Sequence, residues 1–394
     1  MPGPLEGIKI LDFTRWQQGP HATAMLSDMG AEIIKVEERG IGDLGRGLYM
    51  SEDGFCAYFE AHNRGKKSIT LDVRKEKGKE IVYKLVEQVD VVAENFRKGV
   101  MDRLGFSYEK LSQINPKIVY ASGSGYGTQG PLTYRPSYDI VGQGMSGLMV
   151  AQGGGPGRDP QIMACAPADQ VSSMIFAYGI VLGVVARERF GIGQAIDVSL
   201  LGSCFTLQPW PIAGYLRSKQ LFGGSDRYMR SPAFNIFKCK DEKWVVIAML
   251  DARMWPQYCK AVGREAWTEE YADVRKRTQN HAKLVKELEE QVYPARTQAE
   301  WMDHMDKHEI PNGPIYDYEE VASLEQTLAN DYVVTLEHPT YGPIREVGIP
   351  VKFGKTPGAV QGVAPDLGEN TEEILLGLGY DWEQIAELVG EEVI

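Results

Sequence analysis

The chain has 394 residues, of which 43% are hydrophobic and 24% charged, and its formal net charge is −12 at pH 7. This composition is typical of a folded, soluble enzyme and excludes an intrinsically disordered chain. The acidic charge argues against general binding to nucleic acid or to anionic membranes, because both are polyanions. The length favours two domains.

Strand and helix patterns alternate through the first third of the chain. β-rich runs occur at residues 8–13, 33–37, 68–72, 90–94 and 117–121, and helical periodicity at 22–29 and 74–88. Apolar strands that alternate with helices predict a parallel sheet covered on both faces. We therefore expect an α/β fold whose large domain is an open, Rossmann-like parallel sheet, with ligands beyond the carboxyl ends of its strands.

The middle of the chain contains two glycine-rich loops, at residues 123–130 and 152–160, with a predicted helix at 140–150 between them. A long and mostly buried helix is predicted at 169–190, and another at 198–207. The longest apolar stretch, 174–186, is too short to span a bilayer, so no membrane segment is expected.

A smaller domain is predicted after a glycine-containing linker at Gly223 and Gly224. Its pattern is mixed, with a strand at 243–248 and helices at 254–262, 282–293 and 299–308. We expect a large α/β domain over 1–220, a small α+β domain over 221–318 and a C-terminal segment over 319–394 that returns to the large domain. The tail at 371–388 is predicted to be helical.

The five cysteines include no pair at C-x-x-C spacing, which favours reduced thiols over a disulfide framework or a zinc site. Cys165 has no catalytic signature around it and is predicted to be a buried structural thiol. The chain begins directly with a strand pattern, and no signal peptide is visible. A cytoplasmic location is therefore expected.

Two short motifs suggest functions that their surroundings do not support. Residues 125–130 fit the dinucleotide pattern G-x-G-x-x-G, but Pro131 follows at once, where a helix should begin. His304 and His308 have metal-site spacing, but Met305 stands where a metalloprotease helix carries glutamate. We interpret the first as a loop and the second as a solvated helix face, and predict no metal site.

Asp169 follows Pro167 and Ala168 at the predicted start of the long helix. Aspartate is a preferred helix cap, so a structural role is the simpler interpretation. The functional interpretation is a nucleophilic carboxylate, kept ionised at neutral pH by the helix N-terminus. The pattern alone leaves both open.

A series of short motifs in a shared order resembles the class III CoA-transferases, and within them formyl-CoA transferase most closely. The motifs are LEGIKILDFT at 5–14, IKVE at 34–37, KKS at 66–68, ENF at 94–96, GYG at 125–127, GxGQ at 191–194, DVS at 197–199, IPxGP at 310–314 and LGExT at 367–371. The resemblance implies an open-sheet domain with a smaller domain, in two subunits that interlock as a homodimer.

The resemblance also implies a covalent mechanism on Asp169, through an aspartyl–acyl anhydride and an aspartyl-CoA thioester. Coenzyme A would be part of the substrate rather than a permanently bound cofactor, and the partner substrate a small carboxylic acid such as oxalate. The implied site residues are Gln17 beside the reacting acyl group, Tyr58, Tyr138 and Leu48 in the acid pocket, and Arg39, Leu71, Asn95, Phe96, Arg97 and Arg103 for the CoA nucleotide.

Departures from that family leave the acids undefined. Tryptophan is usual where this chain has Leu48, and arginine where it has Glu38, so a larger acid is an alternative. One rival function is an α-methylacyl-CoA racemase of the same fold, but those enzymes carry Gly-His-Asp where this chain has Ser137-Tyr138-Asp139. Another rival is a non-catalytic nucleotide-binding protein, based on the glycine motif.

Overall fold

The computed structural model describes residues 2–220 and 226–394, and it forms two compact units. The large unit comprises Met1–Leu148, Ile162–Ile212 and Glu325–Ile394, and the small unit comprises Met149–Gln161 and Ala213–Leu324. The small unit thus includes a short segment from the middle of the chain and extends a few residues past both expected limits. Gly223 and Gly224 lie outside the described residues.

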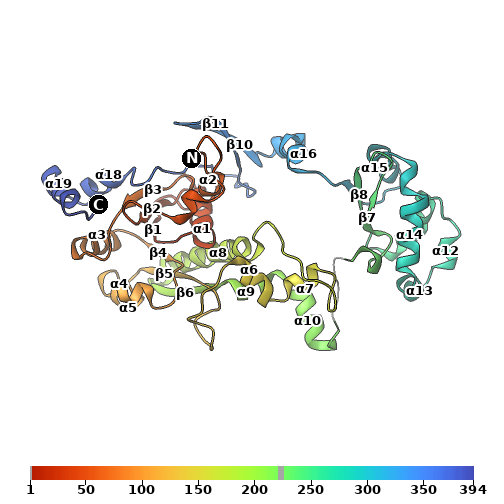
Figure 1. Ribbon diagram of the computed structural model, residues 1–394, viewed down its shortest axis with the longest axis horizontal. Helices are drawn as coiled ribbons and strands as arrows, with labels where there is room; N and C mark the ends of the chain where they lie inside the picture. The colour runs from red at the N-terminus through yellow and green to blue at the C-terminus, as the bar shows by residue number, and fades with distance from the viewer. Residues whose placement is uncertain (1, 221–225) are drawn as a thin grey trace. The chain divides into compact units, whose positions relative to one another are not determined.

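The large unit is built on a six-stranded sheet with the strand order β3-β2-β1-β4-β5-β6, and all its pairs are parallel (Figure 1). The strands are β1 (Lys9–Asp12), β2 (Glu32–Glu37), β3 (Lys67–Thr70), β4 (Val91–Glu94), β5 (Val119–Ser124) and β6 (Gln194–Ser199). This is the Rossmann order, and the predicted open parallel sheet is confirmed.

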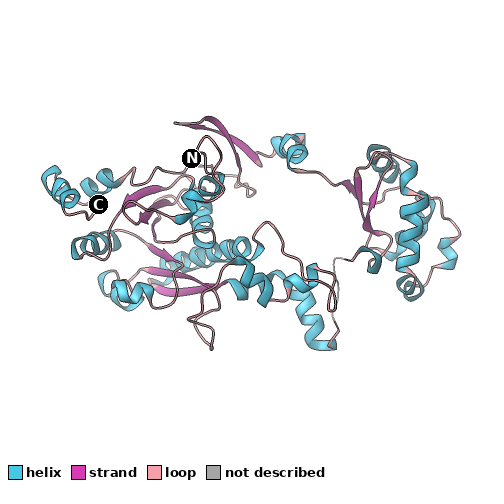
Figure 2. Cartoon of the chain, in the orientation of Figure 1, coloured by secondary structure: helices cyan, strands magenta, loops and turns pink. Residues whose placement is uncertain are grey.

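Helices cover both faces of this sheet, as Figure 2 shows. In β1, Ile10 packs into one hydrophobic core and Leu11 into another, because successive side chains of a strand point to opposite faces. The first face is covered by α1 (Gln18–Ser27) and α8 (Pro167–Phe190). The other is covered by α3 (Glu76–Val86), α4 (Val100–Leu104), α5 (Tyr108–Ile114), α18 (Thr371–Gly377) and α19 (Trp382–Gly390).

Helix α8 was expected to be mostly buried, and the structure corrects this. Only nine of its 24 residues are buried, and its exposed face carries apolar side chains: Met174, Tyr178, Leu182 and Val185. By length and composition alone α8 would suffice to cross a membrane. Its buried side packs on β5, β6 and α1, so it forms a layer of the folded domain.

Several connecting elements were not foreseen. They include α2 (Ala57–Asn63), α10 (Pro209–Ser218), α17 (Glu325–Ala329), the hairpin of β10 (Val333–His338) and β11 (Gly342–Val347), and the edge strand β6. The helix expected at 140–150 is two helices, α6 (Asp139–Met145) and α7 (Leu148–Gln152), separated by Gly147 at φ +82°. The tail helix is likewise divided at Gly379, φ +87°.

The small unit has its own core around a three-stranded antiparallel sheet, ordered β7-β8-β9. Its strands are β7 (Phe234–Lys238), β8 (Trp244–Ala248) and β9 (Asn312–Pro314). Its helices are α11 (Trp255–Ala261), α12 (Trp267–Glu270), α13 (Val274–Gln279), α14 (His281–Gln291), α15 (Gln298–Lys307) and α16 (Tyr318–Ser323).

Candidate active site

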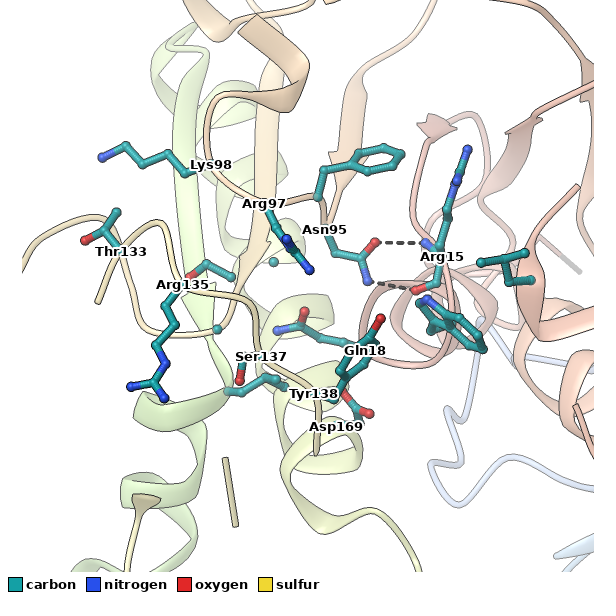
Figure 3. A pocket seen from close by; sticks show the side chains of 17 residues that line it. Arg15, Gln18, Asn95, Arg97, Lys98, Thr133, Arg135, Ser137, Tyr138 and Asp169 are labelled. Carbon is teal, nitrogen blue, oxygen red and sulfur yellow. Dashed lines mark hydrogen bonds between the residues drawn. The ribbon is translucent and has the colours of Figure 1, made fainter. Parts of the chain in front are cut away.

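A cavity of about 240 Å³ opens at the carboxyl ends of β1, β4 and β5 in the large unit (Figure 3). From β1 the chain adds β2 and β3 on one side and then β4, β5 and β6 on the other, so the strand order reverses between β1 and β4. Open parallel sheets usually bind their ligands at this point of reversal. The side chains that line the cavity include Arg15, Trp16, Gln18, Leu44, Asn95, Phe96, Arg97, Lys98, Arg135, Ser137, Tyr138, Asp169 and Leu200.

Asp169 lies in the first turn of α8 and lines this cavity. It does not cap the helix: Ala166 is the N-cap residue, and the cap is supplied by Asp139 from α6. Asp139 Oδ1 accepts hydrogen bonds from the backbone N–H groups of Ala168 at 2.8 Å and Asp169 at 3.1 Å. Because Asp139 takes the capping role, the Asp169 carboxylate is left facing the cavity.

The charge environment of Asp169 differs from the expected one. Burial, and then the charge of Asp139, raise the pKa of the Asp169 carboxyl to about 7. The helix N-terminus does not keep Asp169 fully ionised, since its first N–H groups already serve Asp139. The Asp169 carboxyl therefore holds its proton to a higher pH than an ordinary aspartate does.

Tyr138 and Tyr58 both lie near Asp169, on different elements. Tyr138 lines the cavity and its ring meets that of Trp16 edge to face at 6.3 Å; Figure 3 shows it beside Asp169. Tyr58, on α2, is half-buried and packs against His62. Burial, followed by the charge of Asp169, raises the pKa of the Tyr58 phenol, so it stays a neutral hydrogen-bond donor at pH 7.

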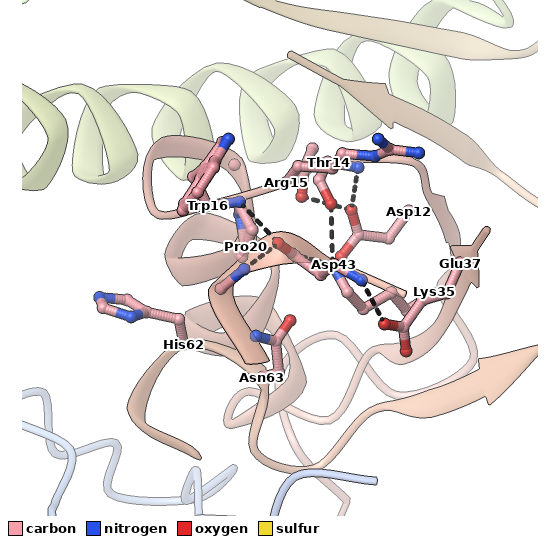
Figure 4. A network of polar contacts seen from close by, with 12 residues as sticks. Asp12, Thr14, Arg15, Trp16, Pro20, Lys35, Glu37, Asp43, His62 and Asn63 are labelled. Atoms are coloured by element: carbon pink, nitrogen blue, oxygen red, sulfur yellow. Dashed lines mark hydrogen bonds and ion pairs between the residues drawn. The ribbon is translucent and has the colours of Figure 1, made fainter. Parts of the chain in front are cut away.

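The loop from Thr14 to Trp16 carries two cavity residues, and side chains of distant segments hold its backbone (Figure 4). Asp12 accepts from the Thr14 N–H at 2.8 Å, and Lys35 Nζ donates to the Thr14 carbonyl at 2.8 Å. Asn95 bonds both backbone groups of Arg15, each at 2.8 Å. This loop is thus positioned from both sides.

Trp16 is the strained member of that loop, with φ +68°, a conformation that side chains other than glycine disfavour. Its backbone N–H donates to Asp43 Oδ1 at 3.2 Å, while Asp43 Oδ2 pairs with Lys35 at 2.9 Å. Lys35 and Asp43 are each about 1% exposed, so the pair lies in the interior. A fixed buried ion pair therefore maintains the backbone of Trp16 beside the cavity.

A second cavity, of about 210 Å³, shares Arg15 and Phe96 with the first. Its apolar lining includes Phe13, Val36, Leu71, Val73, Phe96, Val100 and Leu104. Glu38 pairs with two arginines on its lining, Arg15 at 3.5 Å and Arg74 at 3.6 Å. Two adjoining hollows, one with a largely apolar wall and one that contains Asp169, suit an elongated ligand with a flat apolar end.

Comparison with known proteins agrees with this geometry. The family model described as CoA-transferase family III matches residues 5–371. The chain belongs to CoA-transferase family III. It is 34% identical over 363 residues to the acetyl-CoA:oxalate CoA-transferase of Acetobacter aceti, covering 89% of each chain. It is 34% identical over 415 residues to the formyl-CoA:oxalate CoA-transferase of Bradyrhizobium diazoefficiens, covering 98% of this chain and 96% of that one.

Solved structures show the same fold. A CAIB/BAIF family protein from Brucella suis superposes with a TM-score of 0.84 at 29% identity, over 96% of this chain and 100% of that one. Rv3272 from M. tuberculosis superposes with a TM-score of 0.84 at 28% identity, over 95% of this chain and 99% of that one. The protein is therefore a class III CoA-transferase with the fold of these relatives.

Five predicted residues of this transferase line neither cavity: Tyr58 on α2, Gln17, Leu48, Arg39 and Arg103. Gln17 is buried at the start of α1, and its neighbour Gln18 lines the first cavity instead, with Nε2 donating to Ser172 at 2.6 Å. Leu48 follows the short 3₁₀ helix of Leu44–Gly47, and Leu44 is the cavity residue. Sequence spacing does not show which residue at the end of a helix faces a cavity, which explains these offsets.

The other two are arginines. Arg39 Nε donates to the Ile394 carbonyl at 2.8 Å, so its cation serves the C-terminus. Arg103 is exposed on α4. By contrast Asn95, Phe96 and Arg97 line the first cavity and Leu71 the second, and their predicted contact with CoA stays a prediction. Arg15, Arg74, Lys98 and Arg135 were missed, since a lone basic residue carries no sequence signal.

Two remaining expectations are settled by the described residues. No helix begins at residues 125–130, so the dinucleotide motif lacks its required context. Cys165 is exposed rather than buried, because it lies in the loop before α8. In residues 2–220 and 226–394 no group of three metal-ligating side chains occurs.

Proposed function

We propose that this enzyme transfers CoA from an acyl-CoA to a free carboxylic acid through covalent intermediates on Asp169. The observation that carries the proposal is the position of Asp169. It lines the cavity at the point where the strand order reverses, while Asp139 caps helix α8. A carboxylate without a structural partner in a ligand cavity is suited to act as a nucleophile.

The reaction balances in four steps with no net proton. The Asp169 carboxylate attacks the thioester carbonyl, the C–S bond breaks, and an aspartyl–acyl anhydride and CoA thiolate form. The thiolate attacks the aspartyl carbonyl, which releases the donor acid and leaves an aspartyl-CoA thioester. The acceptor carboxylate attacks that thioester and expels the thiolate, and the thiolate then opens the second anhydride at the acceptor's carbonyl to give the new acyl-CoA.

The two cavities support a binding mode for the acyl-CoA. The adenine fits the apolar second cavity against Leu71 and Phe96, and the pantetheine extends through the shared wall toward Asp169. The Arg15 guanidinium, 5.1 Å from the Phe96 ring centroid, and Arg97 on the rim would contact the phosphates. Tyr58 and Tyr138 would donate to the reacting carboxylate or acyl oxygen, and Gln17 remains a proposed oxyanion donor.

The substrates that we propose are a short acyl-CoA and oxalate. Both named relatives accept oxalate, and they differ in the donor, formyl-CoA in one and acetyl-CoA in the other. Leu48 does not line the cavity in this chain, so its departure from tryptophan does not itself enlarge the described hollow. We further propose a cytoplasmic location and no permanently bound cofactor.

A homodimer is also proposed. Met174, Tyr178, Leu182 and Val185 form an exposed apolar stripe at helical spacing along α8. A stripe of this kind on a helix that already packs one side on the sheet favours a subunit interface. Sedimentation velocity would test it: the wild type should sediment as a dimer, and Tyr178→Glu with Leu182→Glu as a monomer.

The substrate proposal is tested with a panel of formyl-, acetyl- and succinyl-CoA, each with oxalate, followed by chromatography of the CoA esters. Oxalyl-CoA should form from at least one donor, and Asp169→Asn should form none. α-Proton exchange into a branched acyl-CoA, without any transfer, would instead identify a racemase. Transfer that persists in Asp169→Asn would reject the covalent role.

A further inference from the structure

The small unit contains a separate cavity of about 280 Å³, formed by residues at the end of α11, after α14 and along α15. Four basic side chains line it: Lys260, Arg264, Arg296 and His304. No aspartate or glutamate is among its lining residues. In a protein with a net charge of −12, such a concentration of basic groups around one hollow is unexpected.

Arg296 is the central group of this cavity. Its guanidinium lies 4.7 Å from the Trp301 ring centroid, and its Nη1 is shielded from solvent without a hydrogen-bond partner. Among the described residues no carboxylate lies within ion-pair distance of Arg296, and Glu300 on α15 feels its charge only at longer range. Buried donors in proteins are nearly always hydrogen-bonded, because an unpaired one loses its hydration without compensation, so the unpaired Nη1 indicates a missing partner.

Arg264, at the same cavity, differs from Arg296 because its guanidinium has hydrogen-bond partners. Arg264 Nε donates to Glu287 at 2.7 Å, and its Nη2 donates to Gln291 at 3.1 Å. Its charge is therefore compensated from α14. Lys260 and Arg296 have no such carboxylate in the described part of the chain, and they leave an excess of positive charge at the hollow.

The positive charges around this cavity also affect the neighbouring His308. After burial, the charges of His304, Lys260 and Arg296 lower the pKa of His308, which lies one turn beyond His304 and directly follows α15. Each of these groups therefore lies close to the same ring. The His304 ring is oriented by a 2.8 Å contact between Nε2 and the Ala261 carbonyl.

We propose that this cavity binds a compact oxyanion of charge −2, with Arg296 as its main ligand and Lys260 as a second. A guanidinium forms paired hydrogen bonds with tetrahedral or carboxylate oxyanions, and Trp301 holds it flat for that contact. The site uses no residue of the Asp169 cavity. It therefore stands or falls independently of the transfer mechanism.

Isothermal titration calorimetry of the whole protein with sodium sulfate tests the proposal, with ionic strength held constant by sodium chloride. Saturable binding with one site per chain is expected, and inorganic phosphate should compete for it. Arg296→Gln should weaken sulfate binding at least about tenfold, the effect of losing one charge-assisted pair. Arg275→Gln is the matched control, because it removes the same charge from an exposed position on α13 of the same unit.

Lys260→Gln provides a second variant at an exposed position, so its folding is not in question. It should weaken sulfate binding several-fold and leave the melting temperature in chloride unchanged. Equal sulfate affinity in Arg296→Gln and Arg275→Gln would overturn the proposal. Heat that does not saturate in the wild type would overturn it as well, by showing general ionic screening.

Discussion

Two groups of buried charged residues lie at the carboxyl end of the sheet. In one group each charge has a partner of opposite sign, and in the other the charge has none. Around the loop from Thr14 to Trp16 every charge is matched: Lys35 pairs with Asp43 at 2.9 Å, and Lys66 with Asp12 at 3.0 Å. At the start of α8, Asp169 faces another carboxylate and no cation, and its pKa rises to about 7. The matched charges position the backbone, and the unmatched one remains free to react.

Removing the reactive carboxylate should have the largest effect. Asp169→Asn keeps the shape of the side chain but cannot form an anhydride or a thioester, so transfer should fall by about 10³-fold or more. Steady-state assays of CoA transfer would measure it. The circular dichroism spectrum should be unchanged, which separates lost chemistry from lost folding.

Breaking the matched pair should primarily cost stability. Asp43→Ala leaves Lys35 buried without its partner, which typically costs about 3–5 kcal/mol. Asp303→Ala is the control. It removes an ion pair with Lys307 in which the side chains are 69% and 67% exposed, and the loss should cost less than about 1 kcal/mol of stability. Denaturant titration would compare the two variants.

The milder Asp43→Asn tests positioning apart from stability. Asparagine keeps an oxygen for the Trp16 N–H but loses the charge that holds Lys35. We expect kcat to fall about tenfold with little change in KM for the acyl-CoA, because the loop would no longer be fixed beside the reacting group. A change confined to the melting temperature would make Asp43 purely structural.

The raised pKa of Asp169 predicts an acid limb in kcat/KM. The carboxylate is the reactive form, so kcat/KM should be half-maximal near pH 7, reach its plateau above that and fall about tenfold per pH unit well below it. Asp139→Asn retains an oxygen for the two N–H groups but removes the neighbouring charge. The limb should therefore move to lower pH in that variant, and an unchanged limb would assign the titration to another group.

The smallest expected effect is a gain in stability for Asp169→Asn. A carboxyl whose pKa is raised by folding, from 3.8 to about 7, favours the protonated folded state, so its contribution declines as pH rises between those values. Asparagine does not titrate, so in Asp169→Asn this loss of stability with rising pH should be absent. The variant should be more stable than the wild type at pH 8 and no more stable at pH 4. Melting curves at both values would show it.

The parallel sheet and the position of Asp169 could be predicted because each has a local signal. The strands are short apolar runs buried on both faces, and Asp169 lies in a family motif order. The edge strand β6 could not be found in this way, since five of its six residues are partly or fully exposed and Val198 alone in the strand is buried. Edge strands lack the apolar run that marks central ones.

The features that define the site depend on distant partners. Asp139 caps a helix that begins 28 residues later along the chain, and Asn95 holds the backbone of Arg15 across 80 residues. Such hydrogen bonds leave no periodicity in sequence. The family resemblance indicated Asn95 as a ligand residue, and the structure adds that its amide is already engaged by the loop.

The most direct measurement of the central claim is mass spectrometry of the acid-quenched enzyme after mixing with an acyl-CoA and no acceptor. A CoA adduct on the peptide that contains Asp169, absent from Asp169→Asn, is the predicted result. An adduct on another peptide, or full transfer activity without any adduct on Asp169, would contradict the account.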